Sequence, residues 1–167
     1  STEYFLSRAH FGRLPGMHLV ALRHVGDYGA LNAAFGRPHS AWSQVRALAE
    51  AAGLCTDPVF VGIFLDDPTM TPEAQRRADV CVVVRGEATI TGAVRYLRFK
   101  GGPYACAQYV GDSFHLLHAY QGLADEIRRS RRYTFREATA LLIPRTADVD
   151  GKPGIHAYEV YFPVMPK

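Results

Sequence analysis

Two stretches of the sequence, LVALRHVGDY at residues 19–28 and YACAQYVGDS at residues 104–113, share the tripeptide Val-Gly-Asp after an apolar run. The tripeptide lies at residues 25–27 and again at residues 110–112, an offset of 85. A run rich in β-branched and aromatic residues predicts a strand. Glycine then lets the chain turn sharply, and aspartate accepts hydrogen bonds from the first free amides of a helix. Each stretch therefore predicts a strand followed directly by a helix.

The similarity continues down both predicted helices at the same offset. Three pairs of positions agree in kind: Leu31 with Leu116, Ala34 with Ala119, and Phe35 with Tyr120. This agreement favours an internal duplication within a single domain at residues 1–167. The two strand-helix-strand-strand repeats would span about residues 17–85 and about residues 93–164. Two similar halves related by a pseudo-two-fold axis leave a cleft at their interface, where ligand sites often lie.

The rest of the chain alternates between strand and helix patterns. Helical spacing of apolar residues runs from Tyr28 to about Ala52, with a kink or restart at Pro38, and again from Asp112 to about Arg129. Few of the strands are connected through helices, which predicts an α+β fold with a mostly antiparallel sheet. The predicted strands are residues 17–25, 59–65, 79–84, 94–99, 104–110, 138–143 and 156–164.

Composition narrows the class of protein. The chain is 48% hydrophobic and has a net charge of +3, so it should be globular, and it lacks the concentrated basic stripe of a nucleic-acid-binding surface. No run approaches the roughly 20 apolar residues that span a bilayer. The three cysteines have no paired spacing, which argues against a disulfide framework or a zinc cluster. We expect a cytoplasmic protein without metal or cofactor that binds neither nucleic acid nor membrane directly.

Adjacent carboxylates in the stretch GIFLDDP, at residues 62–68, raise the question of catalysis. Asp66 and Asp67 follow a predicted strand and precede a proline, a position where aspartates bond their own backbone and start a turn. No further carboxylate or histidine stands close enough in the sequence to suggest a metal site. We interpret the pair as a turn, with Arg76 or Arg77 as the partner of one aspartate.

The last predicted strand places aromatic residues on both of its faces. Strand alternation puts Tyr158, Val160 and Phe162 on one face. Glu159 and Tyr161 take the other face. A carboxylate beside aromatic rings in a cleft is a common receptor for lipophilic cations. Two glutamates are candidates for that carboxylate: Glu159 on this strand and Glu137 at the start of the neighbouring strand. The open alternative is that both side chains face solvent.

The motifs resemble the GyrI-like small-molecule-binding domain. The resemblance rests on LVALRHVGDY, on VGIFLDDPTMTPEAQRRADVCVVV, on GGPYACAQYVGDSFHLLHAYQGL and on the closing YEVYFPV, and it covers about residues 17–164. It implies two strand-helix-strand-strand repeats around a central cleft for bulky apolar, often cationic compounds. It also implies three kinds of role: the effector-binding domain of AraC- or MerR-type regulators, a gyrase-inhibiting protein, or a hydrolase of reactive electrophiles.

The sequence departs from the family pattern at the charged position. The family has Phe-Glu-x-Tyr before a proline on its sixth strand, whereas the stretch here reads TFREATALLIPR at residues 134–145. Counting back from Pro144 places Ala138 at the glutamate position and Ala140 at the tyrosine position. The tyrosine pair that normally precedes Asp-Asp-Pro is likewise Phe64 and Leu65. A more neutral apolar ligand is therefore plausible.

The sequence thus predicts a module that binds a hydrophobic, aromatic small molecule, cationic if a glutamate reaches the cleft. No catalytic residue is assigned, except that the hydrolase alternative would use Glu137 as its base. A regulatory role would need a DNA-binding domain outside these residues, and gyrase is the other partner that the resemblance implies. The expected ligand contacts are Trp42, Phe64, Tyr104, Tyr120, Glu137, Glu159 and Tyr161.

Overall fold

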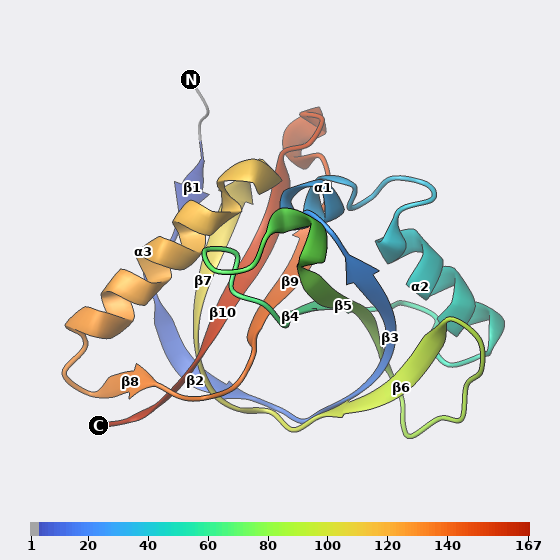
Figure 1. The fold of residues 1–167 in the computed structure, drawn as a ribbon, viewed down its shortest axis with the longest axis horizontal. Coiled ribbons are helices and arrows are strands. Elements are labelled where there is room, and N and C mark those ends of the chain that lie inside the picture. Colours follow the sequence, from blue (N-terminus) through green and yellow to red (C-terminus); the bar gives the residue numbers. More distant parts are fainter. Residues whose placement is uncertain (1–3) are drawn as a thin grey trace.

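A computed structural model describes residues 4–167 and contains one long, strongly curved antiparallel sheet with helices on one face (Figure 1). Its helices are α1 (Tyr28–Ala33), α2 (Ala41–Ala51) and α3 (Leu116–Arg129), and it also contains the 3₁₀ turns η1 (Glu73–Gln75), η2 (Ser113–His115) and η3 (Val149–Gly151). The strands are β1 (Phe5–Leu6), β2 (His10–Leu14), β3 (Met17–Val25), β4 (Phe60–Phe64), β5 (Arg77–Val84), β6 (Val94–Phe99), β7 (Gly102–Gly111), β8 (Tyr133–Phe135), β9 (Ala140–Thr146) and β10 (His156–Pro166).

The order of strands in the sheet repeats the duplication seen in the sequence. The path runs β1-β7-β10-β9-β4-β5-β3-β6, with β2 also paired to β7. On either side of the central β4–β9 pair, β5 mirrors β10 and β3 mirrors β7. Two strands are exchanged between the halves: β2, which precedes β3 in the chain, pairs with β7, and β6, which precedes β7, pairs with β3. The predicted α+β class with a mostly antiparallel sheet is confirmed.

Both Val-Gly-Asp turns cap a helical segment in the same way. The Asp27 carboxylate accepts hydrogen bonds from the backbone amides two and three residues further on, each at 3.1 Å. The Asp112 carboxylate accepts from the corresponding two amides at 2.9 and 3.2 Å. The matching caps satisfy amides that would otherwise lack partners at the helix start, and they confirm the prediction for both turns.

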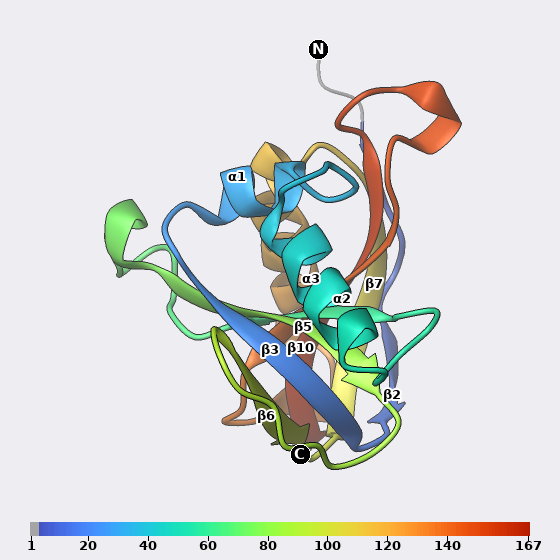
Figure 2. The same ribbon diagram turned by 90° about the vertical axis from the view of Figure 1, so that its right-hand side faces the viewer.

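The two halves differ after these caps. In the first half the predicted break near Pro38 separates α1 from α2, and Ser40 caps α2 through a 3.1 Å bond from the amide of Ser43. In the second half η2 leads directly into the 14-residue helix α3. Figures 1 and 2 show the result: α2 and α3 lie over opposite halves of the sheet, with the short α1 between them.

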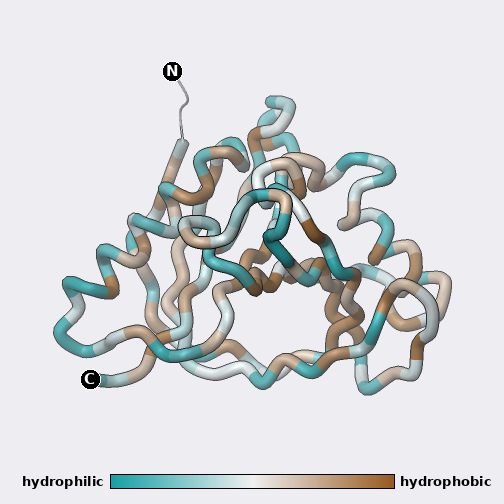
Figure 3. Tube along the Cα trace, viewed as in Figure 1, coloured by the Kyte–Doolittle hydropathy of each residue, from teal (hydrophilic) through white to brown (hydrophobic). Residues whose placement is uncertain are grey.

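The core is divided between the two faces of the sheet. On the helix-covered face, Val80 and Val82 of β5 pack under α2, while Val160 of β10 packs under α3. On the opposite, concave face, Cys81 and Leu141 belong to a third apolar cluster. The apolar colouring of the central strands is visible in Figure 3.

Within residues 4–167, no helix has both the length and the apolar character needed to cross a bilayer.

Three short strands lie outside the sequence prediction. β1 and β2 pair with the outer edge of β7, and β8 pairs with the end of β10. Their sequences, FL, HFGRL and YTF, are too short or too mixed for a period-two pattern. The pairing partner, supplied by the tertiary structure, decides their conformation.

Candidate ligand-binding cleft

A cleft of about 780 Å³ lies between α1, the loop at residues 65–76 and α3. The ends of β4, β9 and β10 contribute its base, so both halves of the sheet form the site. The volume falls within the range of small-molecule sites, about 300–1,000 Å³.

Five aromatic rings form a continuous wall of this cleft, one from each of five elements. Tyr28 of α1 packs on Phe64 of β4 with ring centroids 4.7 Å apart. Phe64 then meets Tyr120 of α3 edge-on at 6.1 Å, and Tyr120 meets Phe162 of β10 at 5.3 Å. Phe135 of β8 completes the series at 5.9 Å from Phe162. These centroid separations are typical of favourable aromatic pairs.

Helix α3 presents one side to the cleft along its whole length. Leu116, Tyr120, Ala124 and Arg128 all line the cleft and follow one another at intervals of four residues, the spacing of neighbours on one helix face. The Tyr120 hydroxyl donates to the backbone carbonyl of Leu141, which fixes its ring against the sheet. Burial raises the pKa of Tyr120 well above its usual value, so its hydroxyl stays protonated.

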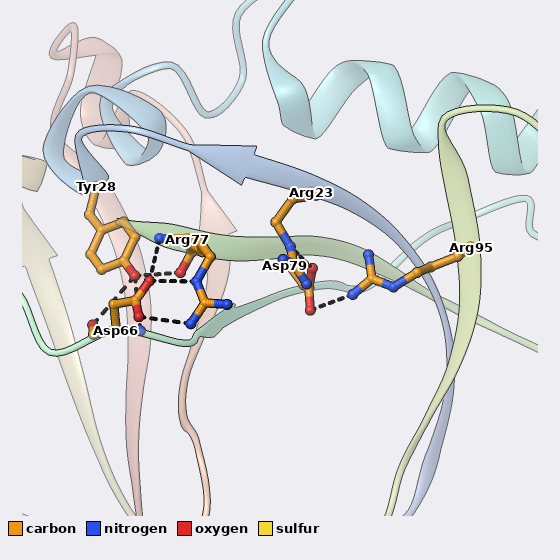
Figure 4. A network of polar contacts seen from close by, with 6 residues as sticks. All are labelled: Arg23, Tyr28, Asp66, Arg77, Asp79 and Arg95. Carbon is orange, nitrogen blue, oxygen red and sulfur yellow. Dashed lines mark hydrogen bonds and ion pairs between the residues drawn. The ribbon is translucent and has the colours of Figure 1, made fainter. Parts of the chain in front are cut away.

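Asp66 closes one end of the cleft as part of a polar network (Figure 4). Both of its carboxylate oxygens accept bonds from the Arg77 guanidinium at 3.0 Å, and one also accepts from the Arg77 amide at 2.8 Å. The Tyr28 hydroxyl donates to the Arg77 carbonyl and accepts from the Asp66 amide. The bonds from Arg77 lower the pKa of Asp66, which therefore stays ionised. The predicted pairing of an aspartate with Arg77 is confirmed.

Asp67 has a local role in the same loop. Its carboxylate accepts from the Thr69 amide at 2.8 Å and from the Thr69 hydroxyl at 2.7 Å, an Asx-type turn. These bonds lower the pKa of Asp67. Arg76 donates to the backbone carbonyls of Thr71 and Pro68 and so closes the loop. The two aspartates therefore form a turn, as predicted from the sequence.

The opposite end of the cleft carries two arginines. The Arg128 guanidinium pairs with Asp125 at 3.0 Å and lies over the ring of Phe135 at 5.7 Å. Arg136 donates to the backbone carbonyls of Val164 and Pro103. With Arg76, these give three arginines on the lining, against three carboxylates from Asp27, Asp66 and Asp67. The formal charges of the lining therefore balance.

Of the aromatic residues expected from the sequence, Phe64 and Tyr120 line the cleft, whereas Trp42 lies elsewhere. Trp42 is 1% exposed, and its ring packs edge-on against Phe35 and Phe60 at 5.8 and 5.9 Å. Its indole N–H donates to the backbone carbonyl of Leu31. Trp42 fills the space between α2 and the sheet.

Strand alternation turns three further expected residues away from the cleft. Tyr161 and Tyr104 belong to the apolar cluster on the concave face, with ring centroids 6.2 Å apart. Glu159 shares the face of Tyr161, whose hydroxyl donates to the Glu159 carboxylate at 2.6 Å. Arg145 donates two bonds of 3.0 Å to the same carboxylate. The predicted alternation on β10 is thus confirmed, and it places Glu159 on the face opposite the cleft.

Glu137 is exposed and lines a second, smaller cavity of about 390 Å³ on the concave side. That cavity also contains Asp79, whose buried carboxylate is bound by Arg23 at 2.8 Å and by Arg95 at 2.7 Å (Figure 4). The residues that follow Glu137, Ala138 and Ala140, do line the main cleft. The positions of the family's glutamate and tyrosine thus lie at the cleft but carry methyl groups.

Several lining residues were missed in the sequence. Tyr28 could have been found, because it follows the capping Asp27 and so begins a helix directly beside the strand ends. Phe162 lies on the predicted aromatic face of its strand, but nothing local showed that this face meets the cleft. Phe135 belongs to the short strand β8, which has no sequence signature. Asn32 lies on the short helix α1, four residues after Tyr28, and nothing in the surrounding sequence marked it as a cleft residue.

Comparison with known proteins gives a family model and several relatives. The model of the GyrI-like small-molecule-binding domain matches residues 10–165. The putative transcriptional regulator YosT of the SPbeta prophage in Bacillus subtilis (strain 168) is 30% identical over 93 residues, which span 55% of this chain and 58% of that protein. The match therefore covers a little over half of the curated relative.

Two solved structures show the same fold. The chain superposes on EcmrR, from a cryo-electron microscopy structure of an EcmrR–DNA complex, with a TM-score of 0.75 and 15% identity, over 96% of this chain and 57% of EcmrR. It superposes on SAV2435 bound to tetraphenylphosphonium with a TM-score of 0.57 and 13% identity, over 95% of this chain and 94% of SAV2435. At these identities the similarity shows a shared fold.

Proposed function

The chain belongs to the family of GyrI-like small-molecule-binding domains, and on that premise we propose that its ligand is a hydrophobic aromatic compound held in the cleft between α1 and α3. The observation that carries this proposal is the wall of five rings contributed by both halves of the molecule. A flat apolar ligand would remove these ring faces from water and contact both halves at once. Burial of that kind supplies much of the affinity in small-molecule sites.

Two of the residues expected from the sequence, Phe64 and Tyr120, remain proposed ligand contacts. We add Tyr28, Phe135 and Phe162, which line the same cleft. An affinity near 1 µM corresponds to about −8 kcal/mol. That value is reasonable for a ligand with two or three rings, because each CH₂-sized group buried contributes about 0.8 kcal/mol before the cost of immobilisation.

We further propose that the domain is the effector-binding unit of a transcriptional regulator in the cytoplasm. The match to part of YosT and the fold shared with part of EcmrR support this role. A DNA-binding domain is then the proposed partner that responds to ligand. Gyrase is the alternative partner implied by the family; inhibition of DNA supercoiling by the purified chain would support it.

Calorimetric titration with 2-methylnaphthalene tests the cleft as the ligand site. We expect Phe64→Ala to weaken binding at least 10-fold, because Phe64 joins the rings of α1 to those of α3. The matched control is Phe5→Ala, since Phe5 is 57% exposed on β1 and lies outside the cleft. Equal affinities for Phe64→Ala and the wild type would reject the cleft as the site.

A further inference from the structure

The side chain of Asn32 is unusual among the residues that line the cleft. The residue is 2% exposed, and its Oδ1 has no hydrogen-bond partner among residues 4–167. Its backbone is firmly held, because the Asn32 carbonyl accepts from the Tyr158 hydroxyl at 3.2 Å and from the Phe35 amide at 3.1 Å. The Oδ1 atom is therefore buried on a held backbone, without a hydrogen-bond partner among the described residues.

Such an arrangement calls for an explanation, because an unpaired buried acceptor is costly and rare in native proteins. At the offset of the duplication, the corresponding residue of the second half is Leu117, which also lines the cleft. A partner supplied by the ligand would explain why the first half carries asparagine here.

Asn32 is placed to contact a ligand that lies on the aromatic wall. It follows Tyr28 by four residues on α1, so the two side chains share one helix face, and both line the cleft. Tyr28 in turn packs on Phe64 at 4.7 Å. A ring stacked along this part of the wall would bring a substituent within reach of Asn32.

The charges around the cleft favour a substituent without net charge. Each lining carboxylate is already engaged: Asp27 by helix amides, Asp66 by Arg77 and Asp67 by Thr69. Lining arginines and carboxylates are equal in number. The position where the family's glutamate would meet a cation is Ala138, in the bend before β9, whose methyl group cannot attract either sign of charge.

Building on the proposed function, we propose that the ligand is a neutral aromatic compound carrying an N–H or O–H donor, and that Asn32 Oδ1 accepts that hydrogen bond. A carboxamide matches the asparagine best, because its carbonyl can accept from Asn32 Nδ2 while its N–H donates to Oδ1. Asn32 is then a specificity-determining residue, and the aromatic wall supplies the remaining affinity.

A series of naphthalenes with one variable substituent tests this inference by calorimetric titration. We expect wild-type protein to bind 2-naphthamide at least 10-fold more tightly than 2-naphthoate or trimethyl(naphthalen-2-ylmethyl)ammonium. Asn32→Leu, which installs the residue of the second half, should weaken binding of 2-naphthamide at least 5-fold more than binding of 2-methylnaphthalene. A charged probe that binds most tightly, or equal losses for amide and methyl probes, would overturn the inference.

A second measurement needs no variant. Methyl 2-naphthoate has the carbonyl and about the size of 2-naphthamide but lacks a hydrogen-bond donor. Wild-type protein should therefore bind the ester at least 5-fold more weakly than the amide. Equal affinities would refute a hydrogen bond from the ligand to Asn32 Oδ1. The proposed function fails separately, if 2-methylnaphthalene does not bind or binds equally to Phe64→Ala. Binding of 2-methylnaphthalene without discrimination between amide and ester would retain the cleft as the site and reject only the role of Asn32.

Discussion

The two halves of the molecule start alike and then diverge, and the cleft is built from the difference. Both leave a strand through Val-Gly-Asp and cap the next helical turn with that aspartate. In the second half α3 then runs without interruption beside the sheet. In the first half the chain breaks after α1, and α2 moves out over β3 and β5. The continuous helix α3 forms a long wall of the cleft, and the break between α1 and α2 leaves the space of the cleft opposite α3.

Corresponding positions take different roles as a result. Phe35 and Tyr120 agree at the offset of 85, yet Phe35 is buried against Trp42 and Phe60 whereas Tyr120 forms part of the cleft wall. Asn32 and Leu117 both line the cleft but differ in polarity. Corresponding positions of a duplicated fold can therefore pack in the core in one copy and line the cleft in the other, while the backbone signals stay the same.

The largest effect on stability is expected for Trp42, whose ring fills the space between α2 and the sheet in the first half. Trp42→Ala should lower the free energy of unfolding by about 4 kcal/mol, because it removes a fully buried side chain and leaves a cavity between α2 and the sheet. Urea denaturation followed by circular dichroism measures the change. Ile127→Ala, which truncates a buried residue of α3, should cost about 3 kcal/mol. If Ile127→Ala lowered the free energy of unfolding more than Trp42→Ala, the packing of α3 on the sheet would contribute more stability than the packing of α2, contrary to this prediction.

A smaller effect tests whether the two caps are equivalent. Asp27→Ala and Asp112→Ala should each lower stability by about 1 kcal/mol, since each leaves two helix amides without the carboxylate. Asp112→Ala should cost slightly more, because Asp112 also contacts the His115 ring at 2.8 Å. Glu87→Ala, at an exposed loop position, is the control with little expected effect. Caps that differ by more than about 1 kcal/mol would contradict their equivalence.

The smallest effect concerns a link between the halves. Asp148, in the loop before β10, accepts bonds of 2.6 and 2.9 Å from Arg37 in the break of the first half. These bonds lower the pKa of Asp148 to about 2. The ion pair therefore contributes stability above the unfolded-state pKa of about 4, and this contribution is lost as the pH falls through about 2.

Asp148→Asn removes the charge and tolerates the positive φ of 49° at this position. We expect the thermal midpoint of the wild type to exceed that of Asp148→Asn at pH 5, and the difference to shrink towards pH 2. Differential scanning calorimetry at both pH values measures it. A difference that stays constant on acidification would show that the ion pair does not link the halves energetically.

The sequence could predict the duplicated order of elements, both caps, the helix break and the pairing of one aspartate with Arg76 or Arg77, because each depends on neighbours in the chain or on strands joined by one loop. It also predicted the alternation on β10 and two residues of the cleft, Phe64 and Tyr120. The other expected ligand contacts were chosen only because their side chains are aromatic or acidic. Aromatic or acidic character does not tell which face of a sheet a residue occupies relative to a distant helix.

By itself, then, the sequence determined what is periodic and local in this protein: strands, helix starts, turns and the repeat of 85 residues. The tertiary structure alone decided which face of the sheet became the cleft. That choice follows from the exchange of β2 and β6 between the halves and from the outward position of α2. It places Trp42 in the core, turns Glu159 to the concave face and leaves Asn32 Oδ1 without a hydrogen-bond partner among residues 4–167, because these environments arise only when segments far apart in the chain pack together.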